Sequence, residues 1–372
     1  MQLSVIILNY NVRYFLEQCV LSVQKALEGI DGEIIVIDNA SSDDSCEMMK
    51  AKFPHIKLIE NEANLGFPKG NNIGVAQAKG EYICILNPDT VVAEDTFSKI
   101  LNTKNWQLNT GIIGCKLIDG AGNFLPESKR GVPTPWVAFT KIFGLYKISN
   151  FFGKYYAQHL SEKETGKVDI LVGAFMVMKR ELYLEVGGFD ENCFMYSDDI
   201  DLSYLVLKTG KSNYYFHETS VIHYKGESTV RDGTYMKRFR EAMQFFYKKH
   251  FKKSWFFDVM MQVGSFVFSL LKKNQQKNEV RTIDEYVVFS KGNLELNLSK
   301  KATYLSDFNY FENQSHKNIE IIFDTTTFSF AEIITFMQLN KSKNLSFKNY
   351  ISSSNYLIGS NNSNDRGQII LL

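Results

Sequence analysis

The chain contains 372 residues, enough for two or three domains with a substantial buried core. With 44% hydrophobic and 22% charged residues, it is neither a disordered nor a fibrous protein. A formal charge of +1 supplies no overall positive field for binding nucleic acid, so we expect no nucleic-acid partner.

The cysteines and the N-terminus bear on the cellular compartment. The 5 cysteines are widely spaced and include no C-x-x-C pair, which indicates neither a disulfide framework nor a zinc site and fits a reducing cytoplasm. The chain enters an apolar run at residue 3 with no basic region before it, which predicts a first strand rather than a signal peptide. No stretch reaches 18 uninterrupted apolar residues, so we expect no membrane span.

The first 120 residues alternate short apolar runs with helical patterns. Four β-rich runs predict buried strands at 5–8, 33–37, 56–59 and 82–86. Between the first two runs, an apolar helix face is formed by Leu16, Val20, Val23 and Leu27. This βαβ order predicts an α/β fold with a mostly parallel, doubly wound sheet, in which ligands lie beyond the carboxyl ends of the strands.

Two further blocks follow. The first predicts a strand at 112–117, a long apolar strand at 168–178 and a short strand at 220–223. After a polar joint at 274–282, a small α/β unit of about 90 residues is predicted. Its expected elements are strands at 286–289 and 319–323, a helix at 330–339, and strands near 344–348, 355–358 and 368–372.

A basic run and an apolar segment separate these blocks. Seven Lys or Arg residues lie between 237 and 253, and residues 255–271 are apolar except on one narrow helical face. Such a helix, with basic flanks, is typical of a segment that lies in a lipid interface. The alternative is a core helix packed on the C-terminal block.

Candidate chemistry begins at the strand ends. Asp89 follows the run at 82–86 and an Asn-Pro, which places a carboxylate at the end of a strand. Hard divalent cations that carry substrate phosphates usually take one or two such carboxylates. Asn-Pro-Asp is also a turn-former, so a plain turn is the alternative. Asp38 and Asn39 at the preceding strand end have the same two interpretations.

A glycine-punctuated segment at 64–74 predicts a loop entering a helix, where backbone N–H groups favour an anion or a closely approaching ligand. It matches neither the P-loop pattern nor a G-x-G-x-x-G after the first strand, which disfavours a kinase-type NTPase or an NAD enzyme.

Three acids, Asp198, Asp199 and Asp201, precede an apolar helical pattern and so occupy a helix N-terminus. The helix dipole keeps a carboxylate ionised there, while repulsion between neighbours raises the proton affinity of one, which suits a general base. Simple N-capping is the alternative. His217 and His223 flank the short strand at 220–223, and each is either structural or a metal ligand.

Taken together, these motifs resemble a known enzyme family over residues 1 to about 250. The segments that carry the resemblance are 9–10, 37–43, 64–66 with 70–72, 86–89, 173–174, 188–191 with 198–201, and residue 223. Their order is similar to that in inverting glycosyltransferases of family 2, which have the GT-A fold. Within that family the chain resembles the bacterial rhamnosyltransferase-like branch, which builds surface polysaccharides.

The resemblance implies roles for particular residues. It places a nucleotide-sugar donor against Asn9, Tyr10, Asp38, Asn39, Gly66, Gly70, Asn71, Asn72, Asp89, Gly173, Ala174, Lys225 and Arg231. It implies Mg²⁺ or Mn²⁺ at Asp89, with His223 as the other protein ligand. The family's usual D-x-D is Asn87-Pro88-Asp89 here, so one acid of the motif is missing. Asp199 aligns with the family's base, and Asp198 would assist it or position the acceptor.

The expected activity is therefore inverting transfer from a nucleotide-diphosphate sugar to a lipid-linked or polysaccharide acceptor in bacterial surface glycan synthesis. The alternative is a catalytically silent nucleotide-sugar-binding or assembly protein, suggested by the missing acid and by a C-terminal block without a catalytic motif. We expect a transferase domain at 1–250, an interfacial helical segment at 251–279 and an α/β unit of unknown role at 280–372. The expected location is cytoplasmic, peripheral on the inner face of the cytoplasmic membrane.

Overall fold

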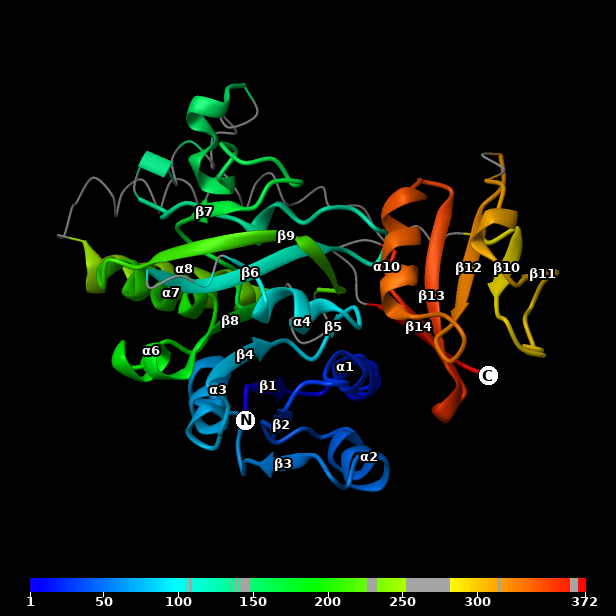
Figure 1. Ribbon diagram of the computed structural model, residues 1–372, viewed down its shortest axis with the longest axis horizontal. Helices are drawn as coiled ribbons and strands as arrows, with labels where there is room; N and C mark the ends of the chain where they lie inside the picture. The colour runs from blue at the N-terminus through cyan, green and yellow to red at the C-terminus, as the bar shows by residue number, and fades with distance from the viewer. Residues whose placement is uncertain are drawn as a thin grey trace.

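The structure is a computed structural model (Figure 1). The residues that it describes are 1–104, 106, 109–134, 136–137, 140, 148–225, 233–251, 282–313, 316–361 and 367–372. Arg231 and the apolar segment at 255–271 lie outside these residues.

A large mixed sheet forms the N-terminal part of the molecule. Its strands are β1 (Leu3–Asn9), β2 (Gly32–Asp38), β3 (Lys57–Glu60), β4 (Tyr82–Leu86), β5 (Thr90–Val91), β6 (Thr110–Ile118), β7 (Gly166–Val168), β8 (Phe175–Lys179) and β9 (Ser212–His223). The strand order is β3-β2-β1-β4-β8-β6-β9-β5, with β7 paired to β9. Strands β1 to β4, β6 and β9 run in one direction, and β5, β7 and β8 run in the other. The expected mostly parallel α/β sheet is confirmed.

Helices cover both faces of this sheet (Figure 1). They are α1 (Arg13–Ala26), α2 (Ser45–Lys52), α3 (Gly66–Ala76), α4 (Thr96–Leu101), α6 (Arg180–Glu185), α7 (Asp198–Lys208) and α8 (Gly233–His250). Short 3₁₀ turns occur at Pro126–Ser128 and Asn150–Tyr156. The basic run therefore lies largely on α8. Among the described residues, no helix is both long and apolar enough to cross a membrane.

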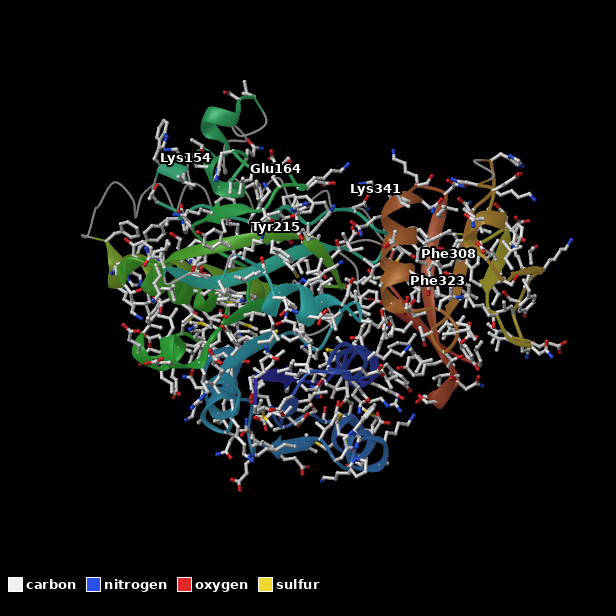
Figure 2. The ribbon with its side chains drawn as sticks, viewed as in Figure 1. Lys154, Glu164, Tyr215, Phe308, Phe323 and Lys341 are labelled. Atoms are coloured by element: carbon white, nitrogen blue, oxygen red, sulfur yellow. The ribbon has the colours of Figure 1, made fainter. Side chains whose placement is uncertain are left out.

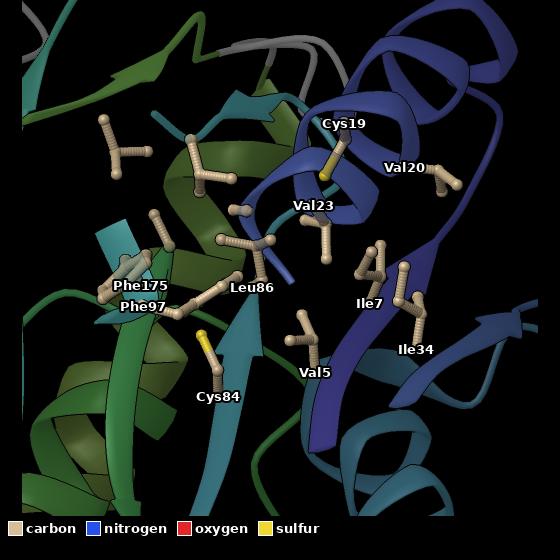
Figure 3. Packing of buried hydrophobic residues seen from close by; sticks show 14 of the residues in the cluster. Val5, Ile7, Cys19, Val20, Val23, Ile34, Cys84, Leu86, Phe97 and Phe175 are labelled. Carbon is tan, nitrogen blue, oxygen red and sulfur yellow. The ribbon is translucent and has the colours of Figure 1, made fainter. Parts of the chain in front are cut away.

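Alternating burial explains how α1 and α3 attach to opposite faces. Val5 and Ile7 of β1 pack against Val20 and Val23 of α1 in one core cluster (Figure 3). Ile6, from the intervening position, faces the other way with Ile37 of β2 and packs with α3. The approach of α3 requires glycine, because a Cβ at Gly74 would lie 2.5 Å from side-chain atoms of both Ile6 and Ile37.

Two predicted strands require correction. The single strand expected at 168–178 is divided between β7 and β8. Between them, two backbone N–H groups bond to side chains of α7: Leu171 N donates to Ser203 Oγ at 3.3 Å, and Gly173 N donates to Asp199 Oδ2 at 3.1 Å. The short strand expected at 220–223 is the end of β9, which begins at Ser212. A register shift against β6 displaces residues 217–219 and masks the continuity in the sequence pattern.

The C-terminal unit contains a second sheet. Its elements are β10 (Glu285–Phe289), β11 (Ala302–Leu305), β12 (Ile319–Asp324), α10 (Phe330–Leu339), β13 (Leu345–Ile351), β14 (Tyr356–Gly359) and β15 (Gln368–Leu371), with short 3₁₀ turns at Phe308–Tyr310 and Ser352–Ser354. The strand order is β11-β10-β12-β13-β14-β15, parallel as far as β13 and antiparallel beyond it. Strand β11 is not in the sequence prediction.

An aromatic core joins α10 to this sheet. Phe308 and Phe323 lie beside each other (Figure 2), with ring centroids 5.9 Å apart. Both rings also contact the ring of Phe336 on α10. The same apolar cluster continues into the first domain through Phe15 of α1 and Tyr224. The two sheets therefore share a buried boundary, with α1 and α10 between them (Figure 1).

Candidate active site

The carboxyl ends of β1 and β2 form one rigid polar corner. Asn9 lies opposite Asp38 in the parallel register and donates from Nδ2 to Asp38 Oδ1 at 2.7 Å. Ser41 donates to the same carboxylate from its backbone N at 2.8 Å and from its Oγ at 2.6 Å. Tyr10, 36% exposed, stands beside this corner. A buried, pre-oriented carboxylate next to an exposed aromatic ring has the chemistry to bind a nucleoside.

Asn39 connects this corner to the glycine-containing segment. Its Nδ2 donates to Gly66 O at 3.1 Å, and its Oδ1 accepts from Asn61 Nδ2 at 2.8 Å. Gly66 has φ +82° at the start of α3, and a Cβ there would lie 2.8 Å from Phe194. Glycine is therefore required both by the left-handed backbone and by the close approach.

Gly70, Asn71 and Asn72 lie inside α3, whereas the sequence predicts a loop. A Cβ at Gly70 would lie 2.4 Å from the side chain of Leu8, so this glycine permits close packing on β1. Asn71 Nδ2 donates within the helix to Phe67 O at 2.9 Å. Asn72 holds the 187–191 segment, since its Nδ2 donates to the backbone oxygen of residue 189 at 2.9 Å. In the structure these three residues position the surrounding elements.

Asp89 and His223 come together at the end of β4. The two residues are 3% and 6% exposed, and Asp89 Oδ1 lies 3.4 Å from His223 Nε2. Although close, these atoms are not aligned as a hydrogen bond. Among the described residues, the buried atoms without a hydrogen-bond partner include Asp89 Oδ1, His223 Nδ1 and Asn87 Oδ1. Unpaired buried oxygens and an imidazole nitrogen are the ligand types that a divalent cation takes.

Two observations limit this candidate metal site. The described part of the chain contains no group of three or more His, Cys, Asp or Glu side chains placed to hold a metal ion. Lys225, a candidate for phosphate neutralisation, forms an ion pair with Glu127. Burial favours the neutral form of Glu127, but the charge and hydrogen bond of Lys225 outweigh burial and lower its pKa. The Lys225 charge is thus already balanced within the protein.

The acid pair lies at the start of α7, as the sequence predicts. Asp199 Oδ2 accepts from Arg130 Nη2 at 2.5 Å and from Gly173 N at 3.1 Å. Burial, together with the charge of Asp199, raises the pKa of Asp198 to about 7. Two adjacent carboxyls thus have different surroundings: one faces a cation, and the other is driven towards its neutral form.

Arg130 is the functional candidate that sequence reasoning missed. It is 8% exposed, and its Nη2 also donates to Leu171 O at 2.9 Å. Burial opposes its charge, yet Asp199 and Tyr155 together outweigh burial and raise the pKa of Arg130. An isolated bridge between Arg130 and Ile170 brings it to the acid pair. Arg130 and Asp199 are 69 positions apart in the chain, so no local sequence pattern predicts their contact.

Asp201 has a structural role instead. Its Oδ2 lies 2.8 Å from Lys249 Nζ, and its Oδ1 lies 2.5 Å from His250 Nε2. Lys249 also contacts Asp190 Oδ2 at 2.7 Å, so α8 is fastened both to α7 and to the 187–197 segment. Burial lowers the pKa of His250, although Asp201 opposes this effect.

Gly173 and Ala174 connect the two halves of the site. Ala174 O accepts from Asn87 N at 3.1 Å, beside Asp89, while Gly173 N donates to Asp199. A Cβ at Gly173 would lie 3.4 Å from Asp199 Cβ. This short segment therefore links the candidate metal site to the acid pair beyond the strand ends, where doubly wound folds bind ligands.

Comparison with known proteins shows which family and which relatives this chain resembles. The family model "Glycosyl transferase family 2" matches residues 4–187. An N-acetylglucosaminyl-diphospho-decaprenol L-rhamnosyltransferase of Mycobacterium tuberculosis is 26% identical over 241 residues, covering 62% of this chain and 78% of that protein. Rhamnosyltransferase WbbL of Escherichia coli is 28% identical over 221 residues, covering 54% and 78%. Mannosyltransferase PcManGT of Pyrobaculum calidifontis, a solved structure, has a TM-score of 0.49 at 16% identity, covering 74% and 76%.

Proposed function

Because the chain belongs to glycosyl transferase family 2, whose members invert the anomeric centre, we propose that it transfers a sugar from a nucleotide-diphosphate sugar to a hydroxyl of a lipid-linked or polysaccharide acceptor. The observation that carries this proposal is the short bridge at Gly173 and Ala174, which joins the Asp89 group to the acid pair. A leaving diphosphate and an attacking hydroxyl need sites of these two kinds within one crevice.

We assign the nucleoside to the corner at Asn9 and Asp38, beside Tyr10 and Asn39. The Asp38 carboxylate already accepts hydrogen bonds from Asn9 and Ser41, so it is oriented before the donor arrives. Pre-orientation reduces the entropy lost on binding. Gly66 lets α3 begin close to this corner, and Gly70, Asn71 and Asn72 support the wall behind it.

We assign Mg²⁺ or Mn²⁺ to Asp89 and His223, because the buried Asp89 Oδ1 has no hydrogen-bond partner and lies 3.4 Å from His223 Nε2. When bound there, the cation would balance the negative charge that develops on the leaving diphosphate. With one carboxylate and one imidazole as protein ligands, the donor's own phosphate oxygens would complete the coordination. Arg231 is the cation that we assign to the phosphates, since Lys225 is paired with Glu127.

We assign the general base to Asp199. Its Oδ2 is held by Arg130 and by Gly173 N–H, which fixes the orientation of the carboxylate. As the acceptor oxygen bonds to the anomeric carbon, its proton passes to Asp199, and the bond from that carbon to the diphosphate oxygen breaks. Inversion in one displacement requires no covalent intermediate with the protein. Asp198, whose pKa is raised to about 7, would donate a hydrogen bond that positions the acceptor when it is protonated.

The names of two relatives support the acceptor class, and the basic helix α8 supports the membrane position. One relative acts on a decaprenol-linked sugar by its name, and another is the minor teichoic acid biosynthesis protein GgaB of Bacillus subtilis. We propose a bacterial surface glycan as product and a peripheral position on the inner face of the cytoplasmic membrane. The basic helix α8 supports this position, because anionic lipid attracts such segments. Flotation of the full chain with phosphatidylglycerol vesicles should occur at low salt and weaken at high salt; no flotation at low salt would contradict it.

The decisive experiment is a screen of nucleotide sugars for binding, followed by mass spectrometry of products with a polyprenyl-diphosphate sugar as acceptor. We expect one donor to bind and its sugar to be transferred to the acceptor. A protein that binds a nucleotide sugar but neither transfers nor hydrolyses it would instead be the silent binding or assembly protein that the missing acid suggests.

A further inference from the structure

The C-terminal unit contacts α1 at its N-terminus, the end nearest to the proposed donor site. Tyr356 of β14 donates from its OH to Tyr14 O at 3.0 Å, and the two rings meet edge to face with centroids 4.9 Å apart. The Arg13 guanidinium lies 4.2 Å from the centre of the Tyr14 ring and 6.0 Å from that of Tyr356. Arg13 is therefore packed between its own helix and the second sheet.

A buried charge reinforces this contact. Glu17 of α1 is fully buried and lies 2.9 Å from Arg13 Nη1 and 2.8 Å from Lys52 Nζ. Ser353 Oγ donates to Glu17 Oε1 at 3.3 Å, and Ser354 Oγ also donates to Glu17 Oε1. A buried carboxylate requires such partners to remain ionised. The C-terminal unit thus supplies part of the shell that holds Glu17, and Glu17 in turn holds Arg13.

Arg13 also binds the loop that follows β2, so a fixed Arg13 limits the movement of that loop. Its backbone N donates to Asp43 Oδ2 at 3.0 Å, and its Nε lies 3.2 Å from Asp44 Oδ2. The same loop contains Ser41, which binds Asp38 and donates from Oγ. The loop that shapes the nucleoside corner is therefore fastened to the N-terminus of α1, and α1 is fastened to the C-terminal unit.

A second contact reaches the other end of the site. Asn349 of β13 donates from Nδ2 to Tyr224 OH at 3.3 Å. Tyr224 follows His223 directly, packs edge to face on Phe15 with ring centroids 5.2 Å apart, and donates from its backbone N to Asp89 O at 3.0 Å. The C-terminal unit thus touches the supports of both the nucleoside corner and the Asp89 group.

We propose that the C-terminal unit is a positioning element for donor binding, acting through Arg13 and Tyr224, and that Tyr356 and Ser354 are its positioning residues. This inference rests on the proposed donor site. None of these side chains is assigned to the reacting atoms. Free arginine side chains sample many rotamers, so holding Arg13 before the donor arrives lowers the entropic cost of ordering the loop. The unit that lacks a catalytic motif thereby has a role in donor binding.

The test compares two perturbations of the same interface. Tyr356→Leu removes the hydrogen bond and the ring beside Arg13, and Ser354→Ala removes one Glu17 partner with little change in volume. Glu94→Gln is the matched control, because Glu94 accepts from Phe330 N at 2.8 Å and Ala331 N at 2.9 Å and so joins the two units at the distant start of α10.

Binding of UDP, dTDP and GDP is measured by calorimetry on the full chain, with thermal melting of each variant, and donor KM and kcat are then measured separately. We expect Tyr356→Leu and Ser354→Ala to weaken the bound nucleotide by about 5- to 10-fold, raising donor KM while kcat at saturating donor stays within about twofold. Tyr356→Phe, which keeps the ring, should recover part of this loss. Glu94→Gln should lower the melting temperature without a comparable change in nucleotide binding.

The outcomes separate the two proposals. Unchanged nucleotide binding in Tyr356→Leu and Ser354→Ala would overturn the positioning role alone, as would an equal loss in Glu94→Gln, because the C-terminal unit would then only stabilise the fold. A wild-type chain that binds none of the three nucleotides would overturn the donor site itself and this inference with it.

Discussion

The substitution Asp199→Asn tests the base and its support together. The side chains of Asp199 and Arg130 are only 12% and 10% exposed, so their ion pair is shielded from water. Asparagine can still accept hydrogen bonds from Arg130 and Gly173 N, so local geometry should be kept. It cannot take a proton from the acceptor, and removal of a general base costs about 10²- to 10⁴-fold in turnover, or roughly 3–5 kcal/mol in the barrier.

The same change also leaves a buried cation without its counter-charge. Breaking a buried ion pair by removing one partner costs about 3–5 kcal/mol of unfolding free energy, and we expect the lower end because the hydrogen bonds remain. Loss of turnover could therefore be mistaken for loss of fold. Arg130→Met in the Asp199→Asn background removes the stranded cation, so the double variant avoids the cost of an unpaired buried charge.

The double variant thus separates chemistry from stability. Urea unfolding should show most of the lost free energy restored in Arg130→Met/Asp199→Asn, while single-turnover transfer stays at the level of Asp199→Asn and donor binding stays near wild type. The base assignment would be refuted if the double variant regained transfer. It would also be refuted if Asp199→Asn kept near-normal turnover while Asp198→Asn was inactive, since Asp198 would then be the base.

Three other predictions concern the fold and the site. Gly74→Ala would push a Cβ to 2.5 Å from the side chains of Ile6 and Ile37, so we expect a loss of about 1–3 kcal/mol, seen as a lower urea midpoint; an unchanged midpoint would contradict the close packing of α3. Because the folded-state pKa of Asp198 is raised to about 7, its contribution to stability is complete below its ordinary pKa and is lost as pH rises to 7; Asp198→Asn should flatten the fall in unfolding free energy over that range. Asp89→Ala should abolish transfer with little change in melting temperature, because Asp89 Oδ1 has no hydrogen-bond partner to lose; full wild-type activity in excess EDTA would argue against the cation.

Much of the fold follows from the sequence because it depends on neighbours in the chain. The apolar period of α10 predicts its bounds, Phe330–Leu339, and β4 at Tyr82–Leu86 is predicted to the residue. The same holds for the strand-end position of Asp89 and the helix-start position of the acid pair. Buried strands and amphipathic helices can be predicted from the sequence because each has a characteristic pattern of apolar residues.

What tertiary structure decided involves partners far apart in the chain. The run at 168–178 is uniformly apolar, yet its middle bonds to α7 rather than to a strand, because two side chains of that helix accept its N–H groups. The joining of Asp89 to His223 was anticipated only through the family resemblance; the pairing of Arg130 with Asp199 was not anticipated. The hydrogen bond from Ser354 to Glu17 joins residues that are more than 300 positions apart in the chain. The period of apolar residues predicts which face of a helix or strand is buried. It does not predict which charged residue from a distant part of the chain will pack against that face, because only folding brings the two together.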